Sequence, residues 1–157
     1  MPTSLSEDNA GVIAPAPVLY GIAFAVALAM EKLSPTQLPP FPVSAWLGLT
    51  FIAVAIVIAV SAFKALAQAH TAFDARKSTT QIVTTGAFRF SRNPTYLSLT
   101  LLLIGIAFAI SSLWVLVSVV PAVVATQWGV VLREERYLKA KFGEDYRSYA
   151  SKVRRWL

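Results

Sequence analysis

Two short polar segments carry the residues of this sequence whose types and spacing are best suited to chemistry. In the first segment, Arg92 is followed by Asn93 and Pro94 at the start of an expected helix. Asparagine is a preferred helix cap, and proline suits the first turn because it has no N–H to satisfy. A helix N-terminus beside an arginine attracts a carboxylate or a phosphate. An ordinary helix cap explains the same residues equally well.

The second segment contains two adjacent carboxylates, Glu134 and Glu135, between Arg133 and Arg136. They lie near the end of an apolar stretch, where the dipole of a helix favours cations instead. The pair is therefore suited to bind an ammonium or a sulfonium group. Ion pairs with the neighbouring arginines along the helix explain these residues slightly better, so this segment alone does not decide between the two interpretations.

Other catalytic patterns are scarce. The chain has one histidine, His70, and no cysteine. This excludes a disulfide framework, a thiolate metal site, a cysteine nucleophile and a cluster of histidine ligands. The sequence contains no G-x-G-x-x-G pattern, P-loop or H-E-x-x-H pattern. We therefore expect no metal site.

The elements that position these segments follow from the charge pattern. The chain has 157 residues, of which 56% are hydrophobic and only 14% charged, against about 25% charged in soluble domains. No charged residue lies between Asp8 and Glu31, Lys32 and Lys64, or Arg92 and Arg133. A bilayer crossing takes about 20 apolar residues. The gaps predict four spans, at about residues 12–30, 46–67, 95–110 and 113–132.

The expected fold is all-α: a polytopic membrane protein of about four transmembrane helices. Its last two helices form a hairpin that turns at Ser111 and Ser112. A soluble helical protein is disfavoured because these stretches leave no polar faces for a surface. We expect one domain over residues 1–157, with two N-terminal spans in 1–68 and a core in 80–157 that carries both polar segments.

Lysine and arginine predict the orientation, because they accumulate on the cytoplasmic side of membrane proteins. The net charge is +6, and eight basic residues follow Leu132, whereas the loop at 34–45 has none. Both termini and the middle loop should therefore face the cytoplasm, with the protein in the inner membrane of a bacterium. Because topology explains the positive charge, no nucleic-acid partner is expected; membrane lipids are.

The end of the chain has the periodicity of an amphipathic helix. One expected face, at steps of four and three residues, holds Phe142, Tyr146, Tyr149, Val153 and Trp156. The opposite face holds Glu144, Arg147, Ser151, Arg154 and Arg155. Such a helix would lie on the membrane or on the bundle, with its arginines near anionic headgroups.

If the hairpin forms, its antiparallel helices bring Arg92 and Asn93 to the same membrane face as Glu134 and Glu135. A cation, a helix N-terminus and two carboxylates then meet in one place. They match a zwitterionic ligand with a carboxylate, an ammonium and a further positive charge, such as S-adenosylmethionine.

Four motifs, in this order, resemble the isoprenylcysteine carboxyl methyltransferase family of integral membrane methyltransferases and the related phospholipid N-methyltransferases. The motifs are QIVTTGAF at 81–88, SRNPTY at 91–96, EERYL at 134–138 and FGEDY at 142–146. The resemblance implies a helical membrane fold with a cytosol-facing site for S-adenosylmethionine, with S-adenosylhomocysteine as its product, and makes 80–157 the cofactor-binding core. The residues it implies for the cofactor are Gln81, Ile82, Val83, Gly86, Phe88, Arg92, Asn93, Pro94, Tyr96, Glu134 and Glu135.

Two positions depart from the family pattern. Asn93 stands where the motif has histidine, so it exchanges hydrogen bonds but cannot shuttle protons near neutral pH. Val130 and Val131 occupy the region of an arginine that contacts the substrate in eukaryotic members. A prenylcysteine substrate is therefore not expected from the sequence.

The resulting hypothesis is methyl transfer to a small or lipid-like acceptor dissolved in the membrane. A carboxylate or thiolate acceptor would need no strong base, whereas an amine would, and Glu135 and His70 are the candidates. The alternatives are an NADPH-dependent membrane reductase of the sterol-reductase type, which is similar around Arg92 to Tyr96, and a non-enzymatic membrane scaffold. The sequence sets neither the acceptor nor the oligomeric state.

Overall fold

The computed structural model describes residues 10–38, 42–71 and 79–157, and these contain helices and no strand. The all-α prediction is therefore confirmed for this part of the chain. The elements are α1 (Ala16–Leu33), α2 (Val43–Gln68), the 3₁₀ turn η1 (Gly86–Arg89), α3 (Pro94–Ala109), α4 (Leu113–Thr126), the π-helical turn η2 (Gln127–Val131) and α5 (Leu132–Lys152).

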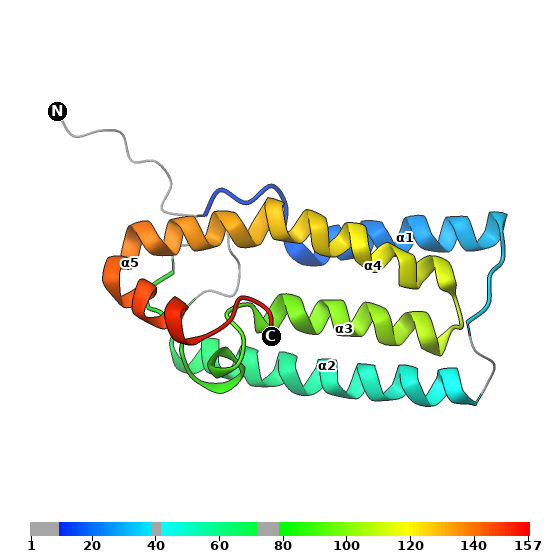
Figure 1. The fold of residues 1–157 in the computed structure, drawn as a ribbon, viewed down its shortest axis with the longest axis horizontal. Helices are drawn as coiled ribbons and strands as arrows, with labels where there is room; N and C mark the ends of the chain where they lie inside the picture. Colours follow the sequence, from blue (N-terminus) through cyan, green and yellow to red (C-terminus); the bar gives the residue numbers. More distant parts are fainter. Residues whose placement is uncertain (1–9, 39–41, 72–78) are drawn as a thin grey trace.

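Helices α1 to α4 form an antiparallel bundle in which α1 packs on α4 and α2 packs on α3 (Figure 1). One end of the bundle holds the chain after α1 and the turn between α3 and α4, which meet through a hydrogen bond from Leu38 N–H to the Ser111 carbonyl. The other end holds the segment before α3, together with α5 and the C-terminus (Figure 1). Both polar segments therefore lie at the same end.

Three helical stretches are long and apolar enough to cross a membrane: α1, α2 and the continuous stretch Leu113–Lys152. Helix α3 has 16 residues, about 24 Å at 1.5 Å per residue, which is short for a hydrocarbon core of about 30 Å. The membrane-spanning part of the last stretch ends near Leu132, because charged residues begin at Arg133. Large apolar side chains such as Val57 and Val120 are exposed on the bundle and suit contact with lipid.

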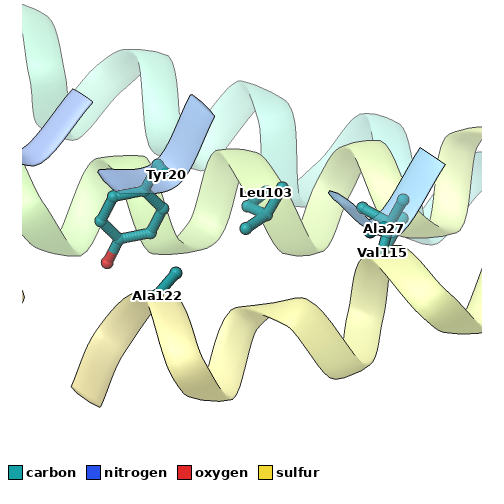
Figure 2. Close-up of a cluster of buried hydrophobic side chains, with 6 residues drawn as sticks. Tyr20, Ala27, Leu103, Val115 and Ala122 are labelled. Carbon is teal, nitrogen blue, oxygen red and sulfur yellow. The ribbon is translucent and has the colours of Figure 1, made fainter. Parts of the chain in front are cut away.

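The core of the bundle combines alanines with a few larger side chains. Tyr20, Ala27, Leu103, Val115 and Ala122 meet between α1, α3 and α4 (Figure 2). Small residues let membrane helices approach closely where no hydrophobic effect drives them together. The Tyr20 hydroxyl lies 2.6 Å from Thr100 Oγ1, which satisfies a polar group inside the bundle.

The turn before α4 forms at the predicted position. Ser112 caps α4, because its Oγ accepts a hydrogen bond from Val115 N–H at 3.2 Å. The Ser112 hydroxyl in turn donates to Glu31 Oε2, and Thr36 N–H donates to Glu31 Oε1. A single carboxylate thus ties the end of α1 to the α3–α4 hairpin.

Two glycines set the spacing between α2 and α3. A Cβ atom on Gly48 would lie 2.6 Å from Ala109 N and 2.8 Å from the Gly105 carbonyl oxygen. Gly48→Ala is expected to cost about 1–3 kcal/mol of stability by overpacking, and so to lower the melting temperature in detergent by several degrees. Gly21→Ala is the matched control, since nothing lies within 4 Å of its added Cβ. Equal melting temperatures for both variants would contradict this close packing.

The predicted C-terminal helix is only partly correct. Helix α5 runs on from α4 through η2, turns at Gly143 (φ +54°) and ends at Lys152. Val153 and Trp156, expected on its apolar face, lie beyond the helix, as do Arg154 and Arg155 on the other face. The reason is tertiary: the carbonyl groups of the last residues accept hydrogen bonds from the segment before α3 instead of continuing a helix.

Candidate active site

A cavity of about 110 Å³ opens at the polar end of the bundle, between the segment before α3, the N-terminus of α3 and the start of α5. Nine of the residues that the sequence predicts for a cofactor line it: Gln81, Ile82, Val83, Phe88, Arg92, Asn93, Tyr96, Glu134 and Glu135. Sequence reasoning missed seven further lining residues: Leu66, Thr71, Thr79, Thr95, Leu138, Tyr146 and Tyr149. Tyr146 and Tyr149 belong to the aromatic face predicted for the C-terminal helix. The local sequence did not indicate that this face lines a site.

Two predicted cofactor residues do not line the cavity. Gly86 adopts φ +58°, and a Cβ there would lie 3.1 Å from the Ser61 carbonyl oxygen, so glycine lets η1 lie close to α2. Pro94 is buried as the first residue of α3. Gly86 and Pro94 therefore shape the backbone near the cavity and do not line it.

His70 is exposed and does not line the cavity. It has φ +47°, and its carbonyl accepts a hydrogen bond from Thr80 Oγ1 at 3.3 Å. The next residue, Thr71, is buried and lines the cavity. The structure therefore brings Thr71, and not His70, to the cavity wall. A catalytic role for His70 stays a prediction.

Glu135 is the centre of an ion-pair cluster. Only 4% of this residue is exposed. Arg92 Nη1 lies 3.0 Å from its Oε1. Arg155 donates from Nε to Oε1 at 2.9 Å and from Nη2 to Oε2 at 2.8 Å. Paired donors of this kind form strong, directional contacts, so two arginines hold this carboxylate in place.

Arg155 was expected on the polar face of the C-terminal helix, but it lies beyond the end of α5. Its guanidinium instead reaches back to Glu135, twenty residues earlier in the chain. The hydrogen bond to Glu135 raises the pKa of Arg155 above its ordinary value. Nothing in the local sequence distinguishes Arg155 from its neighbour Arg154, so only the path of the tail identifies it.

Glu134 has a different environment from Glu135. Its Oε2 accepts a hydrogen bond from the Tyr96 hydroxyl at 2.8 Å. Burial raises the pKa of Glu134 to about 7, although the hydrogen bond from Tyr96 lowers it and the nearby charge of Glu135 raises it further. A carboxyl group with a pKa near neutrality can exchange a proton under physiological conditions.

Two tyrosines of α5 close the cavity. Burial raises the pKa of both Tyr146 and Tyr149 above the ordinary value of a phenol, so both are neutral near pH 7. The Tyr149 hydroxyl donates to the Phe88 carbonyl at 2.8 Å. This contact joins α5 to η1, two elements that are far apart in the sequence.

Asn93 is at the predicted capping position, since α3 begins at Pro94, but its side chain makes no capping hydrogen bond. It donates instead from Nδ2 to the Arg155 carbonyl at 2.9 Å. The predicted N-cap position is therefore confirmed, but the Asn93 side chain contacts the C-terminal tail instead of capping α3.

A second cavity, here called the apolar groove, has a volume of about 400 Å³. It lies among the spans and is lined by Pro17, Ala55, Ile56, Ala59, Phe63, Thr95, Tyr96, Ser98, Leu99 and Leu102. Thr95 and Tyr96 also line the first cavity. The two cavities therefore share wall residues in the first turn of α3.

The π-helical turn η2 directly precedes the glutamates. π-helical turns insert an extra residue into a helix and are frequent at functional sites. Here Val130 and Val131 of this turn are fully buried, and Glu135 after it is buried as well. The sequence showed only a continuous apolar stretch at this point.

Among the residues that the structure describes, no group of three or more His, Cys, Asp or Glu side chains could hold a metal ion. Arg92 Nε, by contrast, is buried and has no hydrogen-bond partner in that part of the chain. An unsatisfied buried donor is costly. Arg92 also lines the cavity, so this donor is available to an acceptor group there.

Comparison with known proteins gives a family. A sequence model of the phospholipid methyltransferase family matches residues 43–145, which is more than half of the chain. A protein of Haemophilus influenzae described as uncharacterized is 39% identical over 62 residues, which cover 40% of this chain and 98% of that protein. No solved structure matches the chain. Because the family match includes α2, α3, α4 and both polar segments, the chain belongs to the phospholipid methyltransferase family.

Proposed function

We propose that this protein transfers the methyl group of S-adenosylmethionine to a lipid-like acceptor that enters from the bilayer. The observation that carries the proposal is that Thr95 and Tyr96 line both cavities. One cavity is charged and lies at an end of the bundle, and the other is apolar and lies among the spans. A charged cofactor and an apolar acceptor would meet at these shared residues, with the charged end facing the cytoplasm.

The charged cavity fits the cofactor by its chemistry. Arg92, with its unpartnered Nε, would bind the carboxylate of the cofactor. The Glu134 carboxylate would favour its positive groups. At about 110 Å³, the cavity is smaller than the roughly 300–1,000 Å³ of pockets that enclose whole ligands of this size. The cavity walls must therefore move apart when the nucleoside enters.

The apolar groove fits a hydrocarbon chain. Its volume of about 400 Å³ is within the range of ligand pockets. Its walls are mainly aliphatic, from α2 and α3, and its polar end is Tyr96. A chain in the groove would place a headgroup beside the Tyr96 hydroxyl and the Glu134 carboxylate.

When bound, S-adenosylmethionine supplies a methyl group on a positively charged sulfur, which needs no further activation. The protein therefore contributes mainly alignment and exclusion of water. For an acceptor that loses a proton, such as an amine, Glu134 accepts it directly or through the Tyr96 hydroxyl. The distance of 2.8 Å between Tyr96 Oη and Glu134 Oε2 suits such a transfer.

Of the possible bases, the geometry favours Glu134. Both oxygens of Glu135 are already engaged in ion pairs with Arg92 and Arg155. His70 is exposed and outside the cavity. Glu134 lines the cavity and makes a hydrogen bond with Tyr96, a residue that both cavities share.

The proposal is tested by calorimetric titration of the detergent-solubilised protein with S-adenosylhomocysteine. Saturable binding is expected, and its absence would refute the proposal. Thermal shifts with NADPH in parallel detect the reductase alternative, because only a reductase should be stabilised by NADPH. Incubation with lipid extracts and radiolabelled S-adenosylmethionine then identifies the acceptor class from the labelled product.

A further inference from the structure

We infer that the C-terminal tail after α5 is a strap that sets the charge of the cofactor cavity, with Arg155 as a positioning residue for Arg92. This inference rests on the proposed function. In this arrangement, Arg155 forms the paired contact with the Glu135 carboxylate. Arg92 thereby keeps a hydrogen-bond donor for the carboxylate of the ligand.

The tail is docked by contacts with the start of α3. Arg92 N–H donates to the Arg154 carbonyl at 2.9 Å, and Asn93 Nδ2 donates to the Arg155 carbonyl at 2.9 Å. The Ser91 hydroxyl donates to the same Arg155 carbonyl at 3.3 Å. Ser91 and Asn93 are both buried. These contacts bridge more than sixty residues of sequence, so the tail is a defined part of the site.

A further contact anchors the end of the tail to η2. Trp156 Nε1 donates to Gln127 Oε1 at 2.9 Å. The tail is therefore held on both sides of Arg155, at the N-terminus of α3 and at the π-helical turn. This path directs the Arg155 guanidinium to Glu135 without making it part of the cavity lining.

The charges around Glu135 explain what Arg155 does. Two guanidinium groups face the single Glu135 carboxylate, so Arg155 adds a positive charge to the one that Arg92 supplies. Arg155 makes the paired contact, whereas Arg92 has one ion-pair contact through Nη1 and an unpartnered Nε. Without Arg155, Glu135 would take Arg92 as its paired donor, because that geometry is the stronger one. The positive charge and the available donor would both be lost.

The test uses two ligands and a neighbouring control. Arg155→Ala, Arg155→Lys and Arg154→Ala are titrated with S-adenosylhomocysteine and with its analogue that lacks the carboxylate. Arg154 is exposed, and its contact with the start of α3 is through its backbone carbonyl. Arg155→Ala should weaken S-adenosylhomocysteine at least tenfold and change the affinity for the analogue by less than twofold. Arg155→Lys should give an intermediate loss, and Arg154→Ala none.

Equal loss of both ligands in Arg155→Ala would overturn the inference, since it would indicate a general structural role; so would no loss of either. If the unmodified protein binds neither ligand, the proposed function fails instead. The strap is then judged by melting temperatures alone, from Arg155→Ala, Glu135→Gln and the double variant. Strong non-additivity supports a direct hold of Arg155 on Glu135, and additivity refutes it.

Discussion

Replacing Arg92 with alanine is expected to weaken S-adenosylhomocysteine binding by about 100-fold. Hydrogen bonds to charged groups contribute about 1.5–3 kcal/mol each, and about 1.4 kcal/mol corresponds to a tenfold change in affinity. Arg92 is largely buried, with 12% of its side chain exposed, so water would not replace the lost contact well. The measurement is calorimetric titration in detergent.

Arg89→Ala is the matched control, because Arg89 lies in η1 close to Arg92 in the sequence but is exposed. The affinity of Arg89→Ala for S-adenosylhomocysteine should stay within twofold of that of the unmodified protein. Arg92→Lys keeps the positive charge but lacks the planar Nε–H group, and is expected to recover only part of the affinity. If Arg92→Ala still binds within threefold, Arg92 does not hold the carboxylate of the ligand.

Replacing Glu134 with glutamine should lower kcat by about 10²–10⁴-fold if the acceptor must lose a proton, which is the usual contribution of a general base. With the pKa of Glu134 raised to about 7 by burial, the rate of the unmodified protein should rise with pH up to about 7 and then level off. Glu134→Gln should lose this rise. The assay is transfer of radiolabelled methyl to lipid extracts between pH 5.5 and 8.5.

Glu144→Gln on the exposed side of α5 is the control and should keep both rate and pH profile. Loss of the acidic limb in His70→Ala instead would make His70 the base. Retention of the full pH profile in Glu134→Gln would exclude Glu134 from the proton transfer.

Glu134→Gln should also stabilise the folded protein at alkaline pH. The pKa of Glu134 is higher in the folded than in the unfolded chain, so the folded state binds more protons between about pH 4.5 and 7. The contribution of Glu134 to the free energy of unfolding is therefore greatest below about pH 4.5 and falls as the pH rises to about 7. Glu134→Gln should melt above the unmodified protein at pH 8 and close to it at pH 5. A lower melting temperature at pH 8 would mean that Glu134 is structural.

Much of the fold was predictable because membrane helices obey local rules. Long uncharged gaps placed the spans, Pro94 marked the first residue of α3 and Ser112 the cap of α4. Each of these signals lies within one or two turns of the element it marks. The interruption of α5 at Gly143, with φ +54°, was not predicted, although glycine adopts this conformation readily.

The candidate site was predictable in part, through the hairpin. Once α3 and α4 are antiparallel, Arg92 and the two glutamates must lie at one end of the bundle. The different roles of Glu134 and Glu135 were not predictable, because adjacent identical residues carry identical local information. Their partners, Tyr96 for one and Arg92 with Arg155 for the other, come from elements distant in the sequence.

The sequence by itself determined the helical membrane class, the positions of the spans and the common face of the two polar segments. Hydropathy and charge act over single helices, so these features need no knowledge of packing. Only the tertiary structure decided the conformation of the C-terminal tail. Residues 153–157 have a helical periodicity, yet hydrogen bonds to Ser91, Arg92 and Asn93 hold them outside the helix. The packing of distant elements also makes Tyr96 a wall residue of both the cavity and the apolar groove.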